Sequence, residues 1–128
     1  MEKFAKIVLT LLATASLLFV LLTLPYYTSL MYKWASGHSM EPEQYPGDLI
    51  ILTENYNISH NDTIYYQYRN KDIIHQVVEI SQKDGEAYYR TKGINNSAKD
   101  YIIVRPDMVK AERMAVIPVS LDRFGIGF

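Results

Sequence analysis

The 128-residue chain contains no cysteine, which excludes disulfide bonds, thiolate zinc sites and a cysteine nucleophile. This absence leaves the redox compartment of the protein open. The chain also lacks an excess of either charge, because thirteen Lys and Arg oppose fourteen Asp and Glu for a net charge of −1. No broad basic surface is expected, so nucleic acid is not an expected partner. The length suits one modest domain.

Charge is also absent from residues 7–24, an apolar run long enough to cross the hydrocarbon core, which takes about 20 residues of helix. Its Thr and Ser hydroxyls can bond back to the helix's own carbonyls. Lys3 and Lys6 precede the run and only Lys33 follows it closely, which favours a cytoplasmic N-terminus with the rest of the chain outside. The alternative is a cleaved signal peptide, because Ala13-Thr14-Ala15 has the small-x-small pattern, but the apolar run continues beyond it.

Aromatic residues follow the apolar run and predict an interfacial belt, formed by Tyr26, Tyr27, Tyr32 and Trp34. The local signals beyond this point are mostly those of strands, because β-branched and aromatic residues recur in short runs. The predicted strands cover residues 49–52, 63–68, 73–80, 87–91, 101–104 and 114–117. Lys83-Asp84-Gly85-Glu86 is typical of a hairpin turn, since Asp-Gly accepts positive φ. One or two helical turns are expected within residues 106–112.

The predicted fold class is therefore mainly β. We expect a single curled sheet or partial barrel carried on one N-terminal transmembrane helix. The predicted domain organisation is an anchor with its flanks at residues 1–35 and an extracytoplasmic β-rich domain at residues 36–128. The expected location is a membrane, with a single pass and the β-rich domain outside.

A serine lies in an unusual setting just beyond the anchor, in Gly37-His38-Ser39-Met40-Glu41-Pro42. A lone serine is inert near neutral pH unless a base lies within hydrogen-bond reach and donors face the developing oxyanion. Taken by itself, Ser39 is equally well explained as an ordinary turn residue.

Three histidines are the natural candidates for such a base. His38 is the immediate neighbour of Ser39, and adjacent side chains usually diverge. His60 lies in a polar stretch that suits a surface loop. His75 lies inside the apolar run Ile73-Ile74-His75-Gln76-Val77-Val78, where an imidazole needs partners to offset its desolvation. A structural histidine with satisfied hydrogen bonds is the alternative at that position.

Three segments in order resemble the sequence boxes of the type I signal peptidases. Ser39-Met40-x-Pro42 with Gly47-Asp48 resembles the nucleophile box, and residues 72–78 resemble the box that carries the general base. The third resemblance is Arg90-Thr91-Lys92-Gly93-Ile94-Asn95-Asn96 followed by Asp100. Bacterial members carry lysine as the base, whereas His75 occupies that place here, as in the archaeal and endoplasmic-reticulum branch.

The resemblance implies the catalytic residues Ser39 as nucleophile, His75 as general base and then acid, and Asp100 as the residue that orients the imidazole. It implies a membrane-bound serine endopeptidase that cleaves N-terminal signal peptides from exported preproteins, in a plasma membrane of archaeal type or one like the endoplasmic reticulum. The expected partners are preprotein signal peptides and the lipid bilayer, and the secretion channel is a further candidate. No metal or organic cofactor is implied.

The sequence departs from the family pattern at two positions that we expect to face each other. Gln76 replaces the arginine that usually follows the base, and Ile94 replaces the aspartate that usually follows the third-box glycine. Losing one member of a buried ion pair costs about 3–5 kcal/mol, whereas neutralising both can be close to neutral. Gly37 stands where some relatives carry an oxyanion-hole serine. Asn-x-Ser/Thr sequons at Asn57, Asn61 and Asn95 agree with an outward-facing domain.

Two other functions remain open. The first is a catalytically impaired, membrane-tethered relative that binds emerging chains without cutting them, motivated by Gln76 and Ile94. The second is a peptidase dedicated to one surface-protein precursor.

Overall fold

The computed structural model describes residues 1–126, without the side chains of residues 25–28. The predicted interfacial residues Tyr26 and Tyr27 therefore lie outside the described side chains, whereas Tyr32 and Trp34 are described and exposed. Contacts between residues divide the chain into two compact units, Met1–Leu30 and Met31–Phe128.

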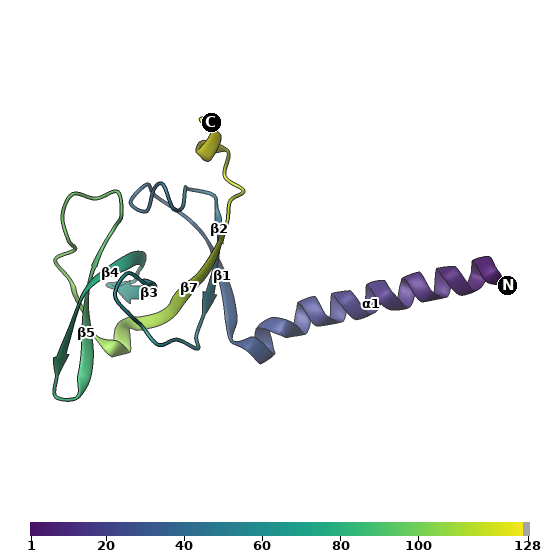
Figure 1. Cartoon of the computed structure of the whole chain (residues 1–128), viewed down its shortest axis with the longest axis horizontal. Helices are drawn as coiled ribbons and strands as arrows, with labels where there is room; N and C mark the ends of the chain where they lie inside the picture. The colour runs from purple at the N-terminus through teal and green to yellow at the C-terminus, as the bar shows by residue number, and fades with distance from the viewer. Residues whose placement is uncertain (127–128) are drawn as a thin grey trace. The chain divides into compact units, whose positions relative to one another are not determined.

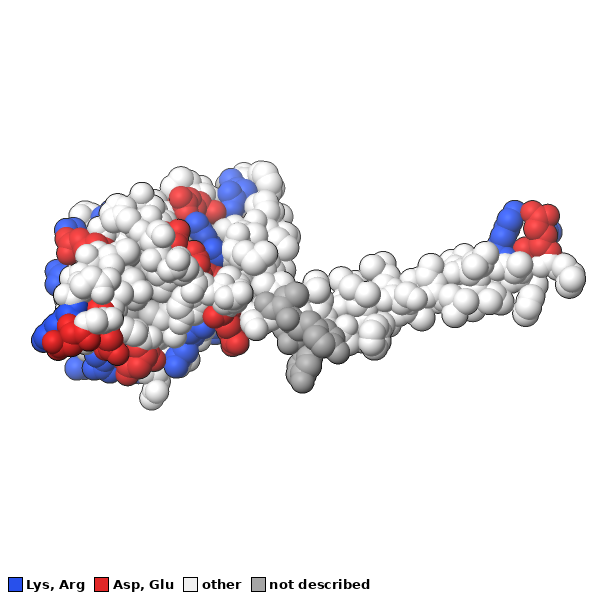
Figure 2. All heavy atoms as spheres, turned by 60° about the horizontal axis from the view of Figure 1, so that its bottom comes forward, with Lys and Arg blue, Asp and Glu red and all other residues white. Residues whose placement is uncertain are grey.

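The first unit is the helix α1 (Glu2–Thr28), whose segment Glu2–Leu24 is long and apolar enough to cross a membrane. At 1.5 Å per residue those 23 residues extend about 34 Å, slightly more than a hydrocarbon core. Hydroxyls along the helix bond back to carbonyls four residues earlier at 2.8–2.9 Å, as predicted, from Thr10, Thr14, Ser16 and Thr23. Figure 2 shows this helix without charged atoms except at its N-terminal end.

The second unit is built on one seven-stranded sheet with the order β1-β2-β7-β3-β4-β5-β6 (Figure 1). Every strand pair whose register is resolved is antiparallel. The strands are β1 (Leu30–Trp34), β2 (Leu49–Thr53), β3 (Thr63–Tyr68), β4 (Lys71–Lys83), β5 (Glu86–Lys92), β6 (Ile103–Val104) and β7 (Val109–Ile117). Two short 3₁₀ turns, η1 (Pro106–Met108) and η2 (Leu121–Phe124), precede and follow β7. The mainly-β class on one apolar N-terminal helix is confirmed, and among the described residues the sheet is open at β1 and β6.

The sheet differs from the predicted strands at β1 and at the start of β7. β1 was not expected, because Leu30–Trp34 reads as the aromatic flank of the anchor, yet it hydrogen-bonds to β2. The expected helical turns within residues 106–112 are wrong beyond Met108, since Val109 already begins β7 and pairs with Tyr66 of β3. The hairpin turn is confirmed, with Asp84 and Gly85 at φ 52° and 78°.

The core lies on both faces of β3, because successive side chains of a strand point to opposite sides. Tyr65 packs with one buried cluster, and Ile64 and Tyr66 pack with another. The first cluster contains Ala35, Ile50, Leu52 and Ala111, and the second contains Val77, Val104 and Val109. The sheet bends between β1 and β4. Lys33 of β1 and Asp72 of β4 form an ion pair of 2.6 Å. In a flat sheet with this strand order, β1 and β4 would lie roughly 19 Å apart, so the contact shows the bend.

The central position of β3 predicts a large difference between two Ile→Ala substitutions. Ile64 is 0% exposed, so Ile64→Ala should lower the free energy of unfolding by about 2–5 kcal/mol. Ile80 on β4 is 39% exposed, so Ile80→Ala should cost less than about 1 kcal/mol. Urea unfolding of the full chain in detergent measures both values, and equal losses would contradict this placement of the core.

Candidate active site

Ser39 lies in the loop between β1 and β2, which is closed at its base by backbone hydrogen bonds. The Ala35 N–H donates to the Asp48 carbonyl at 2.8 Å, and the Gly47 N–H donates to the Ala35 carbonyl at 2.9 Å. Gly37 and Gly47 have φ values of 73° and 92°, which a side chain would disfavour. The Ser39 backbone N–H has no hydrogen-bond partner among the described residues, so it is available to a ligand.

His75 projects from β4, where its backbone pairs with Ile64 of β3. Its Nε2 lies 3.0 Å from the Ser39 Oγ, and its Nδ1 lies 2.5 Å from the Asp100 Oδ2. The structure thus brings the three predicted site residues together in the expected order, although 36 and 25 residues separate the partners along the chain. The side chains of His75 and Asp100 are only 15% and 17% exposed.

Asp100 is held between β5 and β6 by hydroxyl donors and by its backbone. Its N–H donates to the Thr91 carbonyl at 2.8 Å, and its Oδ2 accepts from the Thr91 Oγ1 at 2.7 Å. The Tyr66 hydroxyl lies 2.9 Å from the Thr91 Oγ1 and 3.5 Å from the same carboxylate oxygen. Burial and the neighbouring Asp100 carboxylate raise the pKa of Tyr66 to about 12, so the phenol remains a hydrogen-bond donor.

The Asp100 carboxylate determines which imidazole nitrogen carries the proton. A carboxylate can only accept, so Nδ1 donates to Asp100 and Nε2 is left to accept the Ser39 hydroxyl proton. The arrangement can therefore withdraw a proton from Ser39 while the developing imidazolium charge faces a carboxylate.

The third-box loop packs directly against the Ser39 backbone. The Asn95 N–H donates to the Ser39 carbonyl at 2.8 Å, and its Nδ2 donates to the His38 carbonyl at 3.1 Å. A Cβ added to Gly93 would lie 2.8 Å from the Ser39 carbonyl oxygen, so only glycine fits. The sequence predicts Asn95 only as a sequon and a member of the third box, and it predicts no role for Thr91 or Tyr66. Only the third-box match could have pointed to Asn95.

The other two histidines have partners away from Ser39. The His38 Nδ1 lies 2.5 Å from the Glu41 Oε1, and that carboxylate raises the pKa of the exposed imidazole. The His60 Nε2 lies 2.9 Å from the Val78 carbonyl. Of the two departures, Gln76 donates from its Nε2 to the Asn61 carbonyl at 3.2 Å. Its expected position opposite Ile94 stays a prediction.

A cavity of about 460 Å³ adjoins Ser39. Its lining residues are Tyr32, Lys33, Trp34, Ala35, Ser36, Ser39, Gln44, Asp72 and Ile74. The Lys33–Asp72 ion pair forms part of its wall, and Asp72 also accepts from the Tyr65 hydroxyl at 2.8 Å and the Gln67 Nε2 at 2.9 Å. Hydrogen bonds from Lys33, Gln67 and Tyr65 lower the pKa of Asp72 to about 2. The cavity therefore joins a polar wall to the candidate nucleophile.

One comparison with a known protein agrees with the resemblance to type I signal peptidases. The chain is 33% identical over 78 residues to Signal peptidase I W of Bacillus subtilis (strain 168). This similarity supports the type I signal peptidase family. The match covers 58% of this chain but only 41% of the relative, and no family profile matches the chain. Together with α1, the similarity supports a membrane-anchored protein.

The hydrogen bond from Thr91 to Asp100 predicts different effects on stability for two isosteric Thr→Val substitutions. Thr91 is 0% exposed and donates to Asp100, so Thr91→Val should cost about 1–3 kcal/mol of stability by leaving polar groups unsatisfied. Thr63 is also buried, but its Oγ1 has no partner among the described residues, so Thr63→Val should be neutral or stabilising. Denaturant midpoints measure the difference, and a destabilisation of Thr63→Val equal to that of Thr91→Val would refute the assignment.

Proposed function

We propose that this chain is a membrane-bound serine endopeptidase that removes N-terminal signal peptides from exported preproteins. The observation that carries the proposal is the continuous hydrogen-bonded line from the Ser39 Oγ through His75 to Asp100, with distances of 3.0 and 2.5 Å. A nucleophile, a base and an orienting carboxylate in this geometry suit acyl transfer. The similarity to a named signal peptidase supports the choice of substrate class.

The first half of the reaction forms an acyl-enzyme. His75 accepts the Ser39 proton at Nε2 while the Ser39 Oγ attacks the scissile carbonyl carbon, and the carbonyl π electrons move to oxygen. We propose the Ser39 backbone N–H as a donor to that oxyanion, because it has no partner among the described residues. Collapse of the tetrahedral intermediate breaks the C–N bond, and the imidazolium returns its proton to the leaving amine.

The second half releases the signal peptide and restores the enzyme. A water molecule gives a proton to the His75 Nε2 as its oxygen attacks the ester carbonyl of the acyl-enzyme. Collapse of the second intermediate breaks the bond to the Ser39 Oγ, which takes the proton back from the imidazolium. The Asp100 carboxylate faces the positive charge that forms twice on the ring.

The substrate is proposed to be an extended segment of a preprotein with small residues at the cleavage point and two residues before it. The family resemblance implies this preference, and the cavity beside Ser39 offers room for short side chains. We further propose that α1 crosses the membrane once with its N-terminus in the cytoplasm. A tether of this kind raises the effective concentration of the peptidase toward cleavage points that emerge from the bilayer or from a secretion channel.

A tethered binding protein without activity is the less favoured function. The uncharged Gln76 and Ile94 motivate it, but neither residue interrupts the line from Ser39 to Asp100. The breadth of substrates, one dedicated precursor or many, is a separate question that a survey of uncleaved precursors in depleted cells would answer.

Cleavage of a preprotein by the purified full chain in detergent tests the proposal. Ser39→Ala and His75→Ala should each lower kcat by at least about 10³-fold, because removing one member of such a unit disables the whole. His60→Ala is the matched control and should cleave at the wild-type rate, since the His60 ring bonds to the Val78 carbonyl and not to Ser39 or Asp100 among the described residues. Cleavage that survives Ser39→Ala would rule out the proposed nucleophile, and an inactive wild-type chain would favour the binding protein.

A further inference from the structure

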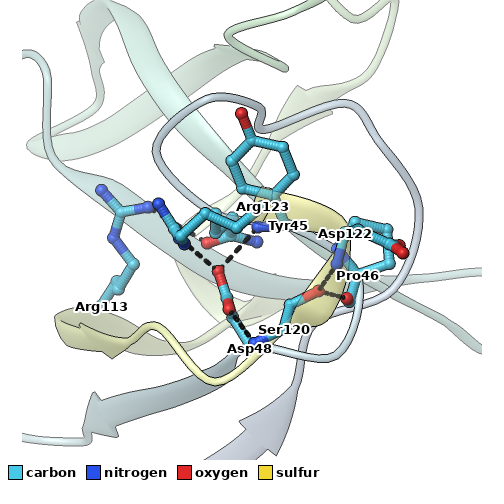
Figure 3. Close-up of polar contacts among 8 residues, drawn as sticks. Tyr45, Pro46, Asp48, Arg113, Ser120, Asp122 and Arg123 are labelled. Atoms are coloured by element: carbon cyan, nitrogen blue, oxygen red, sulfur yellow. Dashed lines mark hydrogen bonds and ion pairs between the residues drawn. The ribbon is translucent and has the colours of Figure 1, made fainter. Parts of the chain in front are cut away.

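A fully buried carboxylate, Asp48, lies at the base of the Ser39 loop. Asp48 is 0% exposed, and its oxygens accept from the Tyr45 N–H at 2.8 Å, the Ser120 N–H at 2.9 Å and the Arg123 Nη2 at 2.5 Å (Figure 3). Burial alone would raise the pKa of Asp48, but these three donors hold it below its ordinary value. The charged Asp48 side chain therefore connects the loop to the C-terminal turn η2 through hydrogen bonds and an ion pair.

The turn η2 contacts the loop at more than one point. The Ser120 Oγ donates to the Pro46 carbonyl, and it also accepts from the Asp122 N–H at 3.2 Å, which caps the turn. The Arg123 guanidinium lies 4.8 Å from the centre of the Tyr45 ring, a cation–π contact. Figure 3 shows Arg123 and Ser120 meeting Tyr45, Pro46 and Asp48 of the loop.

A second arginine holds the middle of the same loop. Arg113 on β7 donates from its Nη1 to the Gln44 Oε1 at 3.1 Å and from its Nη2 to the Glu43 Oε2 at 2.5 Å. Gln44 is only 5% exposed, lines the cavity beside Ser39 and donates its N–H to the Met40 carbonyl at 3.1 Å. These contacts lead from Arg113 through Gln44 to Met40, the residue directly after Ser39.

We infer that Arg123 is a positioning residue for Ser39, acting through Asp48 on the loop that carries the nucleophile. The inference rests on the proposed function. The loop has no helix or strand to hold it, and catalysis requires the nucleophile within about 0.5 Å of its productive place. A displacement of about 1 Å can cost a hundredfold in rate, so a rigid joint at the loop's base affects the reaction at its tip.

The details of the joint fit positioning better than stability alone. The Arg123 Nε is buried and has no partner among the described residues, so the guanidinium is not fully satisfied where it lies. Replacing a buried ion pair by apolar groups is often neutral or stabilising, so such a pair is weak support for a purely stabilising role. Its specific geometry, with one donor on Asp48 and a ring contact on Tyr45, fixes where the loop can lie.

The test compares Arg123→Ala, Arg123→Gln and Arg123→Lys in the full chain, in detergent, at a temperature where each is folded by circular dichroism. Arg123→Ala and Arg123→Gln should lower kcat for preprotein cleavage by about tenfold to a hundredfold, with KM within about twofold. Covalent labelling of Ser39 by a fluorophosphonate should slow by a similar factor. Arg123→Lys, which keeps a charge for Asp48, should recover most of the rate.

Arg105→Ala is the matched control, because it also removes an Arg–Asp pair but an exposed one, with Asp107, and should leave kcat unchanged. The inference is overturned if folded Arg123→Ala keeps the wild-type kcat and labelling rate, or if correcting for the folded fraction accounts for all of its loss. If Arg123→Ala does not fold, equal kcat values for the Gln and Lys variants overturn it. A wild-type chain without preprotein cleavage contradicts the proposed function instead. The inference is then tested by the fluorophosphonate labelling rate of Ser39 in Arg123→Ala relative to wild type, and equal rates overturn it.

Discussion

The hydrogen bond between His75 and Asp100 is the interaction on which the candidate site depends. It joins a strand in the middle of the sheet to a loop near its edge, and it determines the tautomer that leaves Nε2 facing Ser39. Because the carboxylate is mostly buried, its charge needs donors, and these come from Thr91, Tyr66 and the imidazole itself. The hydrogen bonds that position Asp100 therefore also determine how His75 faces the proposed nucleophile.

Bending of the sheet brings the Ser39 loop to this pair. Three strands lie between β1 and β4 in the sheet order, yet Lys33 contacts Asp72, and the Ser39 loop that follows β1 reaches His75 on β4. The core clusters on the two faces of β3 stabilise the bend. A fully buried carboxylate then anchors the same loop at its far end, where Asp48 meets Arg123. The fully buried Asp48 and the mostly buried Asp100, each with donors from distant segments, therefore both contact the surroundings of Ser39.

The sequence predicts the local parts of this structure and misses the long-range ones. The apolar run, most strands and the Asp84-Gly85 turn follow from composition and turn chemistry, because neighbouring residues decide them. β1 was missed since its aromatic residues equally suit a membrane interface. The early start of β7 was missed because a Pro-Asp pair favours a helix start, and pairing with β3 overrides that preference after Met108.

The same limit applies to the site. Ser39, His75 and Asp100 were predicted only through the resemblance to a family, since nothing local shows that His75 reaches Ser39. Arg123 and Asp48 are 75 residues apart, and no local pattern indicates that they meet. Thr91 and Asn95 lie in a recognisable box, but their contacts with Asp100 and with the Ser39 carbonyl depend on how β5 and its loop pack.

Mass spectrometry of the protein quenched in acid during turnover of an ester substrate tests the central claim most directly. The account predicts an adduct of the substrate's acyl mass on the peptide that contains Ser39, strongly reduced in His75→Ala. An adduct on another residue, or turnover with the adduct level on Ser39 independent of His75, would contradict it.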